Sequence, residues 1–208
     1  DKVSGLISLS CFLWFLILSI PTGMLMNRIG RKKTVVVSFA ITALAMLIPV
    51  LKYDFAFVLV AFAMLGIGNT MLQVALNPLV TNVVSAEKLT GTITLGQFIK
   101  AMSSFLGPIL AAMFAGSVWG WKAIFPVYAA VTVLAMAWLA VSPIQEQLIE
   151  KSEITFARTF SLLRDKYIVL FFIGILVLVG VDVGMGVTFP KLLQERCSLP
   201  VSYTHLRA

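Results

Sequence analysis

Residues 66–108 read GIGNTMLQVALNPLVTNVVSAEKLTGTITLGQFIKAMSSFLGP and hold two apolar segments, one on each side of a short polar turn at residues 85–88. Each segment carries polar residues where a helix that faces lipid would carry leucine. They are Asn69, Thr70, Gln73 and Asn77 in the first segment and Gln97, Lys100, Ser103 and Ser104 in the second. Polar groups at membrane depth are costly unless they face other helices or a water-filled cavity. The stretch therefore predicts two transmembrane helices beside a polar cavity.

The composition of the whole chain agrees with a membrane protein. Hydrophobic residues make up 60% of the 208 residues and charged residues 12%, and the mean hydropathy is +1.00. Soluble domains average about 45–50% apolar and about 25% charged residues. Six segments are long enough to cross a hydrocarbon core of about 30 Å: residues 3–25, 34–51, 55–84, 92–117, 123–141 and 167–190. The sequence therefore predicts an all-α, polytopic membrane bundle.

The net charge of +7 fits the loops of such a protein, because cytoplasmic loops carry an excess of Lys and Arg. We therefore predict no nucleic-acid partner. The predicted loops on one face hold nine basic residues: Arg28, Arg31, Lys32, Lys33, Lys88, Lys151, Arg158, Arg164 and Lys166. Those on the other face hold five: Lys2, Lys52, Lys122, Lys191 and Arg196. The excess places the basic turn near residue 30 and the charged segment 142–166 in the cytoplasm.

The two ends of the sequence depart from this pattern. It begins at Asp1 with an apolar segment almost at once, so we expect a fragment whose start is missing. Residues 201–208 resemble translated sequencing-adapter read-through and are set aside, together with the only histidine, His205. We expect a transmembrane bundle over residues 1–143, a cytoplasmic loop over 144–166, a further transmembrane helix over 167–196 and an artefactual tail over 197–208.

The pattern Gly23-x-x-x-Asn27-Arg28-x-Gly30-Arg31-Lys32 resembles a loop motif of the major facilitator superfamily. There the motif joins transmembrane helices 2 and 3, so the resemblance implies that the six segments are helices 2 to 7 and that helix 1 is absent. Residues 144–166 would be the long central loop, and residues 167–196 the first helix of the second bundle. The two glycines would allow a tight turn. Asn27 replaces the usual Asp, which leaves it a helix-capping role.

A second set of residues resembles the fucose permease branch of that superfamily, whose members are proton-coupled sugar symporters. The set comprises Gly66-x-Gly68, Gln73-x-x-x-Asn77-Pro78, Leu95-x-Gln97 and Gly180-x-Asp182-Val183. Gln73 stands where that branch has a proton-linked Glu, and Lys100 where it has a substrate-contacting Asn. Asp182 stands where that branch has an acidic residue in helix 7. The scaffold therefore matches more closely than the coupling chemistry does.

Four polar residues are the predicted substrate-binding residues. Gln73 and Asn77 are four residues apart and share a helix face, and Gln97 and Lys100 are three apart and share another. Amides donate to and accept from sugar hydroxyls at once, although they also form hydrogen bonds between helices. Lys100 lies about eight residues, or ~12 Å, into the predicted helix. It would favour an anionic substrate such as a sugar acid, serve as counter-ion to a carboxylate, or bind a neutral sugar hydroxyl. A structural ion pair or snorkelling is the alternative.

Asp182 is the predicted proton-coupling residue, because a carboxyl group inside the membrane can take a proton from one side and release it on the other. Its alternative role is to neutralise a lysine. Ser103-x-x-x-Gly107-Pro108-x-x-Ala111-Ala112 is similar to the helix 5 signature of major facilitator antiporters, which leaves export open; we favour packing by small residues. The two cysteines, Cys11 and Cys197, suggest neither a disulfide framework nor a metal site.

The sequence therefore predicts a secondary transporter that moves a small polar solute, first of all a sugar or sugar acid, by proton-coupled alternating access. We expect it in the cell inner membrane, in contact with the lipid bilayer, and as a monomer when full length. An exporter of drugs or metabolites and a non-transporting sensor are the alternatives. No nucleophile–base set or metal cluster is present in the sequence, so no enzyme activity, metal or cofactor is expected.

Overall fold

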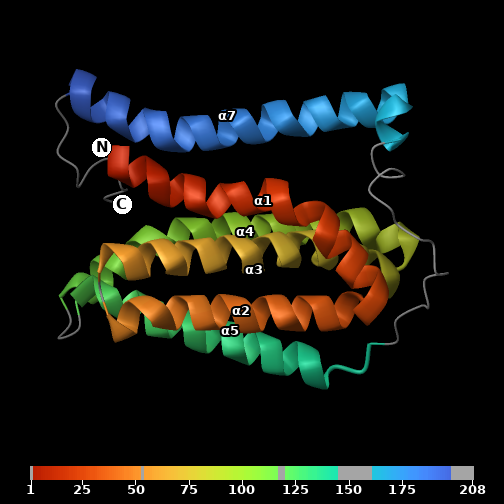
Figure 1. Ribbon diagram of the computed structural model, residues 1–208, viewed down its shortest axis with the longest axis horizontal. Helices are drawn as coiled ribbons and strands as arrows, with labels where there is room; N and C mark the ends of the chain where they lie inside the picture. The colour runs from red at the N-terminus through yellow and green to blue at the C-terminus, as the bar shows by residue number, and fades with distance from the viewer. Residues whose placement is uncertain (1, 53, 117–119, 145–160, 198–208) are drawn as a thin grey trace.

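The computed structural model describes residues 2–52, 54–116, 120–144 and 161–197, and regular structure in these ranges is helical throughout (Figure 1). The long helices are α1 (Lys2–Ile29), α2 (Arg31–Leu51), α3 (Phe55–Val83), α4 (Ala86–Ala115), α5 (Ile124–Val141) and α7 (Lys166–Cys197). Two short 3₁₀ helices, η1 (Gly120–Ala123) and η2 (Leu162–Arg164), precede α5 and α7. The all-α prediction is confirmed.

Among the described residues, four helices are long and apolar enough to cross a membrane: Arg31–Leu51, Phe55–Val83, Ala86–Phe114 and Ile124–Val141. The apolar parts of α1 and α7 whose side chains the structure describes, Leu13–Ile29 and Lys166–Val181, are shorter. The chain is therefore a multi-pass membrane protein. Two of the six segments expected from the sequence do not reach the full spanning length within the described side chains.

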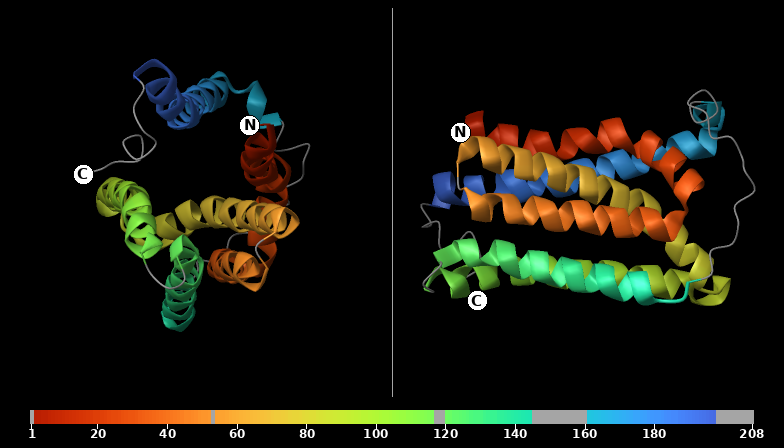
Figure 2. Two further views of the ribbon diagram at one scale, coloured as in Figure 1. Left: turned by 90° about the vertical axis from the view of Figure 1, so that its left-hand side faces the viewer. Right: turned by 60° about the horizontal axis from the view of Figure 1, so that its bottom comes forward.

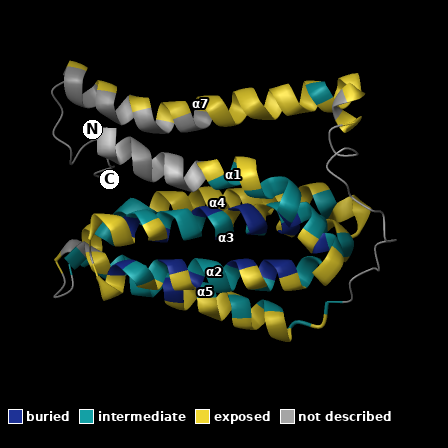
Figure 3. Cartoon of the chain, in the orientation of Figure 1, coloured by how far each residue is buried: buried dark blue, intermediate teal, exposed yellow. Residues whose placement is uncertain are grey.

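The helices lie side by side, with α3 between α1 and α2, and with α5 on the far side of α2 (Figure 1; Figure 2, left). The α4 helix touches α3 and α5 at few positions, and α7 lies apart from the others. Buried residues accordingly gather on α2 and α3, whereas α4 and α7 are largely exposed (Figure 3). The core that positions the other helices is the contact between α2 and α3.

Small side chains let α2 and α3 approach closely, as is usual where helices pack inside a membrane. Gly68 of α3 lies against α2 so tightly that an added Cβ atom would collide with the Thr42 hydroxyl. The same Cβ would lie 3.1 Å from the carbonyl oxygen of Ser38. The buried hydroxyls at this contact are satisfied within their own helices: Ser38 donates to Val35 over 2.7 Å and Thr70 donates to Gly66 over 2.7 Å.

A single residue, Gly30, separates α1 from α2. Its φ of 95° lies in the region that glycine adopts without steric cost. Gly23, in contrast, lies inside α1, and an added Cβ there would meet no atom within 4 Å. The tight turn expected at both glycines is therefore made by Gly30, and Gly23 is an ordinary helical position. Because Pro21 is accommodated within the helix, α1 continues to Ile29, beyond the predicted end at residue 25.

The basic residues after Gly30 hold two other helices. The Lys32 ammonium donates hydrogen bonds to the carbonyl oxygens of Ala140, at 2.9 Å, and Ser142, at 2.8 Å. These carbonyls end α5, where the last turn of a helix has no intrahelical donors and attracts cations. Lys32 thus caps a helix more than a hundred residues away. The basic turn thus contacts the end of α5 through this residue.

The connection between α3 and α4 is shorter than the sequence suggested. The α3 helix ends at Val83, Ser85 is the N-cap residue of α4, and α4 begins at Ala86 rather than at residue 92. Ala, Glu and Lys are strong helix formers, and Glu87 lies in the first turn, where a negative charge is favourable. The polar turn predicted at residues 85–88 is therefore mostly the first turn of a helix.

Replacing Lys32 tests its capping role. Lys32→Met removes both hydrogen bonds to the end of α5, and we expect the free energy of unfolding to fall by about 1–2 kcal/mol. The measurement is the thermal unfolding midpoint in detergent micelles. Lys33→Met is the matched control, because Lys33 is adjacent and exposed. Equal midpoints for the two variants would contradict the capping role.

Replacing Gly68 tests the close contact of α2 with α3. Gly68→Ala places a methyl group against Thr42 and Ser38, and overpacking of this kind costs about 1–3 kcal/mol. We expect its unfolding midpoint to fall. Gly91→Ala in α4 is the control, because a Cβ there meets no atom within 4 Å and alanine favours helix by about 0.5–1 kcal/mol. A fall of the same size in both variants would refute the contact.

Candidate functional site

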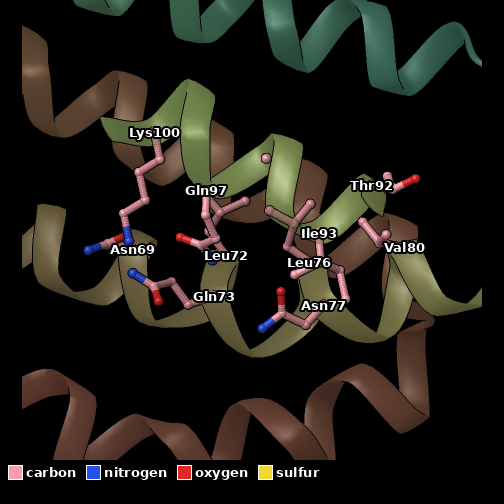
Figure 4. Close-up of a pocket in the computed structure, with 11 residues that line it drawn as sticks. Asn69, Leu72, Gln73, Leu76, Asn77, Val80, Thr92, Ile93, Gln97 and Lys100 are labelled. Atoms are coloured by element: carbon pink, nitrogen blue, oxygen red, sulfur yellow. The ribbon is translucent and has the colours of Figure 1, made fainter. Parts of the chain in front are cut away.

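A pocket of about 370 Å³ lies between α3 and α4 (Figure 4). Its lining combines carboxamides, one ammonium and one hydroxyl with apolar side chains: Asn69, Leu72, Gln73, Leu76, Asn77, Val80, Thr92, Ile93, Gly96, Gln97 and Lys100. Ligand pockets are often built in this way, with a few polar groups set among apolar walls. The four predicted substrate-binding residues, Gln73, Asn77, Gln97 and Lys100, all belong to this lining.

The polar wall on α3 follows from helical periodicity. Asn69, Gln73 and Asn77 recur every four residues and therefore lie one above another on one face of the helix. The residues that pack against α2 and α1 occupy the other face, where Gly68, Thr70 and other small residues are buried. Packing thus turns the three amides toward α4.

The wall on α4 brings Lys100 to the same depth as Asn69. Lys100 is the fifteenth of the 30 residues of α4, and Asn69 is the fifteenth of the 29 residues of α3. Since α4 begins at Ala86, Lys100 lies about 21 Å from its start rather than ~12 Å, yet it is still at the middle of the helix. Its side chain reaches across the pocket toward Asn69 and Gln73 (Figure 4).

The amides of the pocket are available to a ligand. Gln73, Asn77 and Gln97 are exposed, and none of them forms a hydrogen bond with another described residue. The hydrogen bonds between helices that were their alternative role are therefore not formed within the described chain. Each carboxamide can donate and accept at once.

Sequence reasoning missed two members of the pocket and placed one neighbour differently. Asn69 and Thr92 line it but were not predicted as binding residues. The spacing of Asn69, four residues before Gln73, was the signal that could have identified it. Thr70, adjacent in the sequence, is instead buried, and its hydroxyl donates to its own helix.

Asp182 lies in α7, but its side chain falls outside the described residues. The α7 ribbon lies apart from the walls of the pocket in both Figure 1 and Figure 2. The structure therefore brings together four of the five predicted binding and coupling residues. The pairing of Asp182 with Lys100 stays a prediction.

The basic turn after Gly30 contacts the wall of the pocket. The Arg31 guanidinium donates to the carbonyl oxygen of Pro78 at 3.0 Å, and the Thr81 hydroxyl donates to the same oxygen at 2.8 Å. Pro78 directly follows the pocket residue Asn77, and α3 continues through it as a helix. The end of the pocket at Asn77 is thus linked to the basic turn through Arg31.

Two other residues of the loop motif contribute less. Arg28 is exposed in the last turn of α1. Asn27 lies inside α1, and the N-terminus of α2 has no side-chain cap. The capping role predicted for Asn27 is therefore wrong, because Gly30 ends α1 and occupies the N-cap position itself.

The small residues on α4 make few contacts with other helices in the described chain. Ser103 and Ser104 donate to the carbonyl oxygens of Ile99, at 2.9 Å, and Lys100, at 3.0 Å, within their own helix. An added Cβ on Gly107 would lie 3.5 Å from the hydroxyl oxygen of Tyr128 on α5. A Cβ at that distance would make an ordinary van der Waals contact, so the approach of α4 to α5 does not require a glycine there, and packing by small residues stays a prediction.

Comparisons with known proteins give the family of this fold. The family model of the Major Facilitator Superfamily matches residues 2–205. Two curated proteins described as glucose/galactose transporters, from Brucella abortus biovar 1 (strain 9-941) and Brucella abortus (strain 2308), are each 31% identical over 208 residues. These matches cover 92% of this chain and 50% of each relative, so the chain spans about half the length of the curated relatives it matches.

Cysteine labelling tests whether the pocket holds water. With Cys11 and Cys197 replaced by serine, we expect Gln97→Cys to react severalfold faster than Phe98→Cys with a membrane-impermeant thiol reagent. The reacting species is the thiolate, which forms in water and not in lipid. Phe98 is the matched control, because it is exposed but lies outside the pocket lining. Equal rates, measured in membrane vesicles, would argue against a watery pocket.

Proposed function

The chain belongs to the major facilitator superfamily, and on that premise we propose that it forms part of a secondary transporter for a small polar solute, a sugar first of all. Family membership confirms the resemblance carried by the turn motif that ends in Lys32. It also agrees with the expectation of a transporter rather than an enzyme. The more specific resemblance to the fucose permease branch stays a prediction.

The observation that carries the proposal is the amide-lined pocket between α3 and α4. Asn69, Gln73 and Asn77 face Gln97 across it (Figure 4). A sugar offers both donors and acceptors around a ring, and carboxamides match both. Apolar side chains beside the amides, Leu72 and Leu76 among them, suit the C–H faces of such a ring. The two relatives described as glucose/galactose transporters support the same class of solute.

The position of the pocket suits alternating access, in which helical bundles rock around a site near the middle of the membrane. Lys100 and Asn69 both lie at the centres of their helices. The pocket extends from there toward Val80 and Thr92, on the side of the basic turn. We place that turn in the cytoplasm and the protein in the cell inner membrane, because the basic loops lie on this side.

Proton coupling is the finer part of the proposal. Asp182 is the acid that would bind the transported proton, with the Lys100 ammonium as the positive charge that influences its protonation. Both residues lie near the centres of their helices, α7 and α4. A proton taken up on one side and released on the other would drive the solute across.

Uptake into proteoliposomes tests the proposal. In the full-length protein that contains this chain, we expect an inward proton gradient to accelerate the uptake of labelled glucose or galactose. Asp182→Asn should remove this acceleration but retain exchange of sugar down its own gradient. Asp165→Asn is the control, because Asp165 is exposed and precedes the start of α7.

Two results would count against different parts of the proposal. Sugar uptake that is independent of the proton gradient would refute proton coupling. Uptake by Asp182→Asn that still depends on the gradient would refute coupling through this residue. A protein that takes up neither sugar would refute the assignment of these hexoses as solutes.

A further inference from the structure

The pocket between α3 and α4 holds a positive charge that the described structure does not balance. Lys100 is its one ionisable residue among the lining positions, and no carboxylate lines it. The Lys100 ammonium forms no ion pair or hydrogen bond with another described residue. A cation at the middle of a membrane helix is costly unless it has a partner of opposite charge or remains hydrated.

The surroundings of this charge resemble a receptor for an anion. The Lys100 side chain extends from α4 toward Asn69 and Gln73 on α3 (Figure 4). The carboxamides of Asn69 and Gln73 each carry an NH₂ group with two donors. An anionic group placed among the three side chains would accept hydrogen bonds from all of them, and bonds to charged groups are the stronger kind.

The remainder of the pocket suits an uncharged polyol. Asn77 lies eight residues from Asn69 on the same face of α3, a separation of about 12 Å along the helix. Gln97 and Asn77 border this part of the pocket, with Ile93 beside them. The pocket therefore has a cationic end at Lys100 and extends along α3 to the amide of Asn77.

We propose that this site binds a sugar acid, with the carboxylate at Lys100 and the hydroxyl-bearing ring toward Asn77. This inference rests on the proposed transport of a sugar and narrows its substrate class to monosaccharides that carry one negative charge. A neutral hexose would satisfy the amides but leave the ammonium without a counter-charge. A sugar acid satisfies both ends of the pocket.

Paired ligands of the same ring shape test the inference. D-galacturonate differs from D-galactose in carrying a carboxylate in place of the terminal CH₂OH, and it is ionised at neutral pH. With the full-length protein that contains this chain, purified in detergent, we expect galacturonate to bind about tenfold or more tightly than galactose, as one charge-assisted contact predicts. Titration calorimetry at low salt measures both affinities without any substitution.

Variants of Lys100 then test whether the preference for galacturonate over galactose comes from this residue. Lys100→Gln keeps the hydrogen-bonding capacity but removes the charge, so galacturonate affinity should fall about tenfold or more, and by a clearly larger factor than galactose affinity. Lys100→Arg should retain the preference for the acid. Lys88→Gln is the matched control, because it removes a positive charge from the exposed first turn of the same helix, outside the pocket.

The outcomes separate this inference from the proposal on which it rests. Galactose binding as well as galacturonate, or better, would overturn the sugar-acid assignment and leave sugar transport standing. An equal loss of both ligands in Lys100→Gln would also overturn it, because the lysine would then act on the ring and not on the carboxylate. Binding of neither ligand would overturn both.

Discussion

The close contact between α2 and α3 is the interaction on which the rest of the structure depends. Gly68 has no room for a side chain against Ser38 and Thr42, so the two helix backbones meet at that point. Within a membrane there is little hydrophobic drive to hold helices together, and van der Waals packing of this kind takes its place. This contact fixes the rotation of α3 about its axis. Its small residues therefore face α1 and α2, and Asn69, Gln73 and Asn77 face the pocket.

The basic turn between α1 and α2 fixes the neighbouring ends of α3 and α5. Gly30 reverses the chain in one residue, which places Arg31 and Lys32 where they reach α3 and α5. Both side chains donate to backbone carbonyl oxygens: Lys32 to those at the end of α5, which lack intrahelical donors, and Arg31 to that of Pro78 near the end of α3. Cationic side chains therefore connect segments that are distant in sequence, and one of those contacts adjoins the pocket residue Asn77.

The two walls of the pocket are held differently. The α3 helix packs against both α1 and α2, whereas α4 touches α3 at few positions and has no fully buried residue between Ala86 and Phe114. The amides on α3 are therefore carried by an anchored helix and Lys100 by a lightly held one. A movement of α4 relative to α3 would change the distance between the Lys100 ammonium and the amides on α3. Relative movement of this kind is what the proposed alternating access would use.

The sequence by itself determined the all-α class, the order of the helices and the polar faces of the two pocket helices, because hydropathy and four-residue spacing are local properties. Local properties did not show that Asn69 lines the pocket while Thr70 is buried. They also did not show that α4 begins at Ala86, or which groups Lys32 contacts. Only the tertiary structure decided these points. The rotation of α3 depends on the shape of α2 at Gly68, and the carbonyls that Lys32 caps belong to a helix end 108 residues away, so neither can be computed from neighbouring residues.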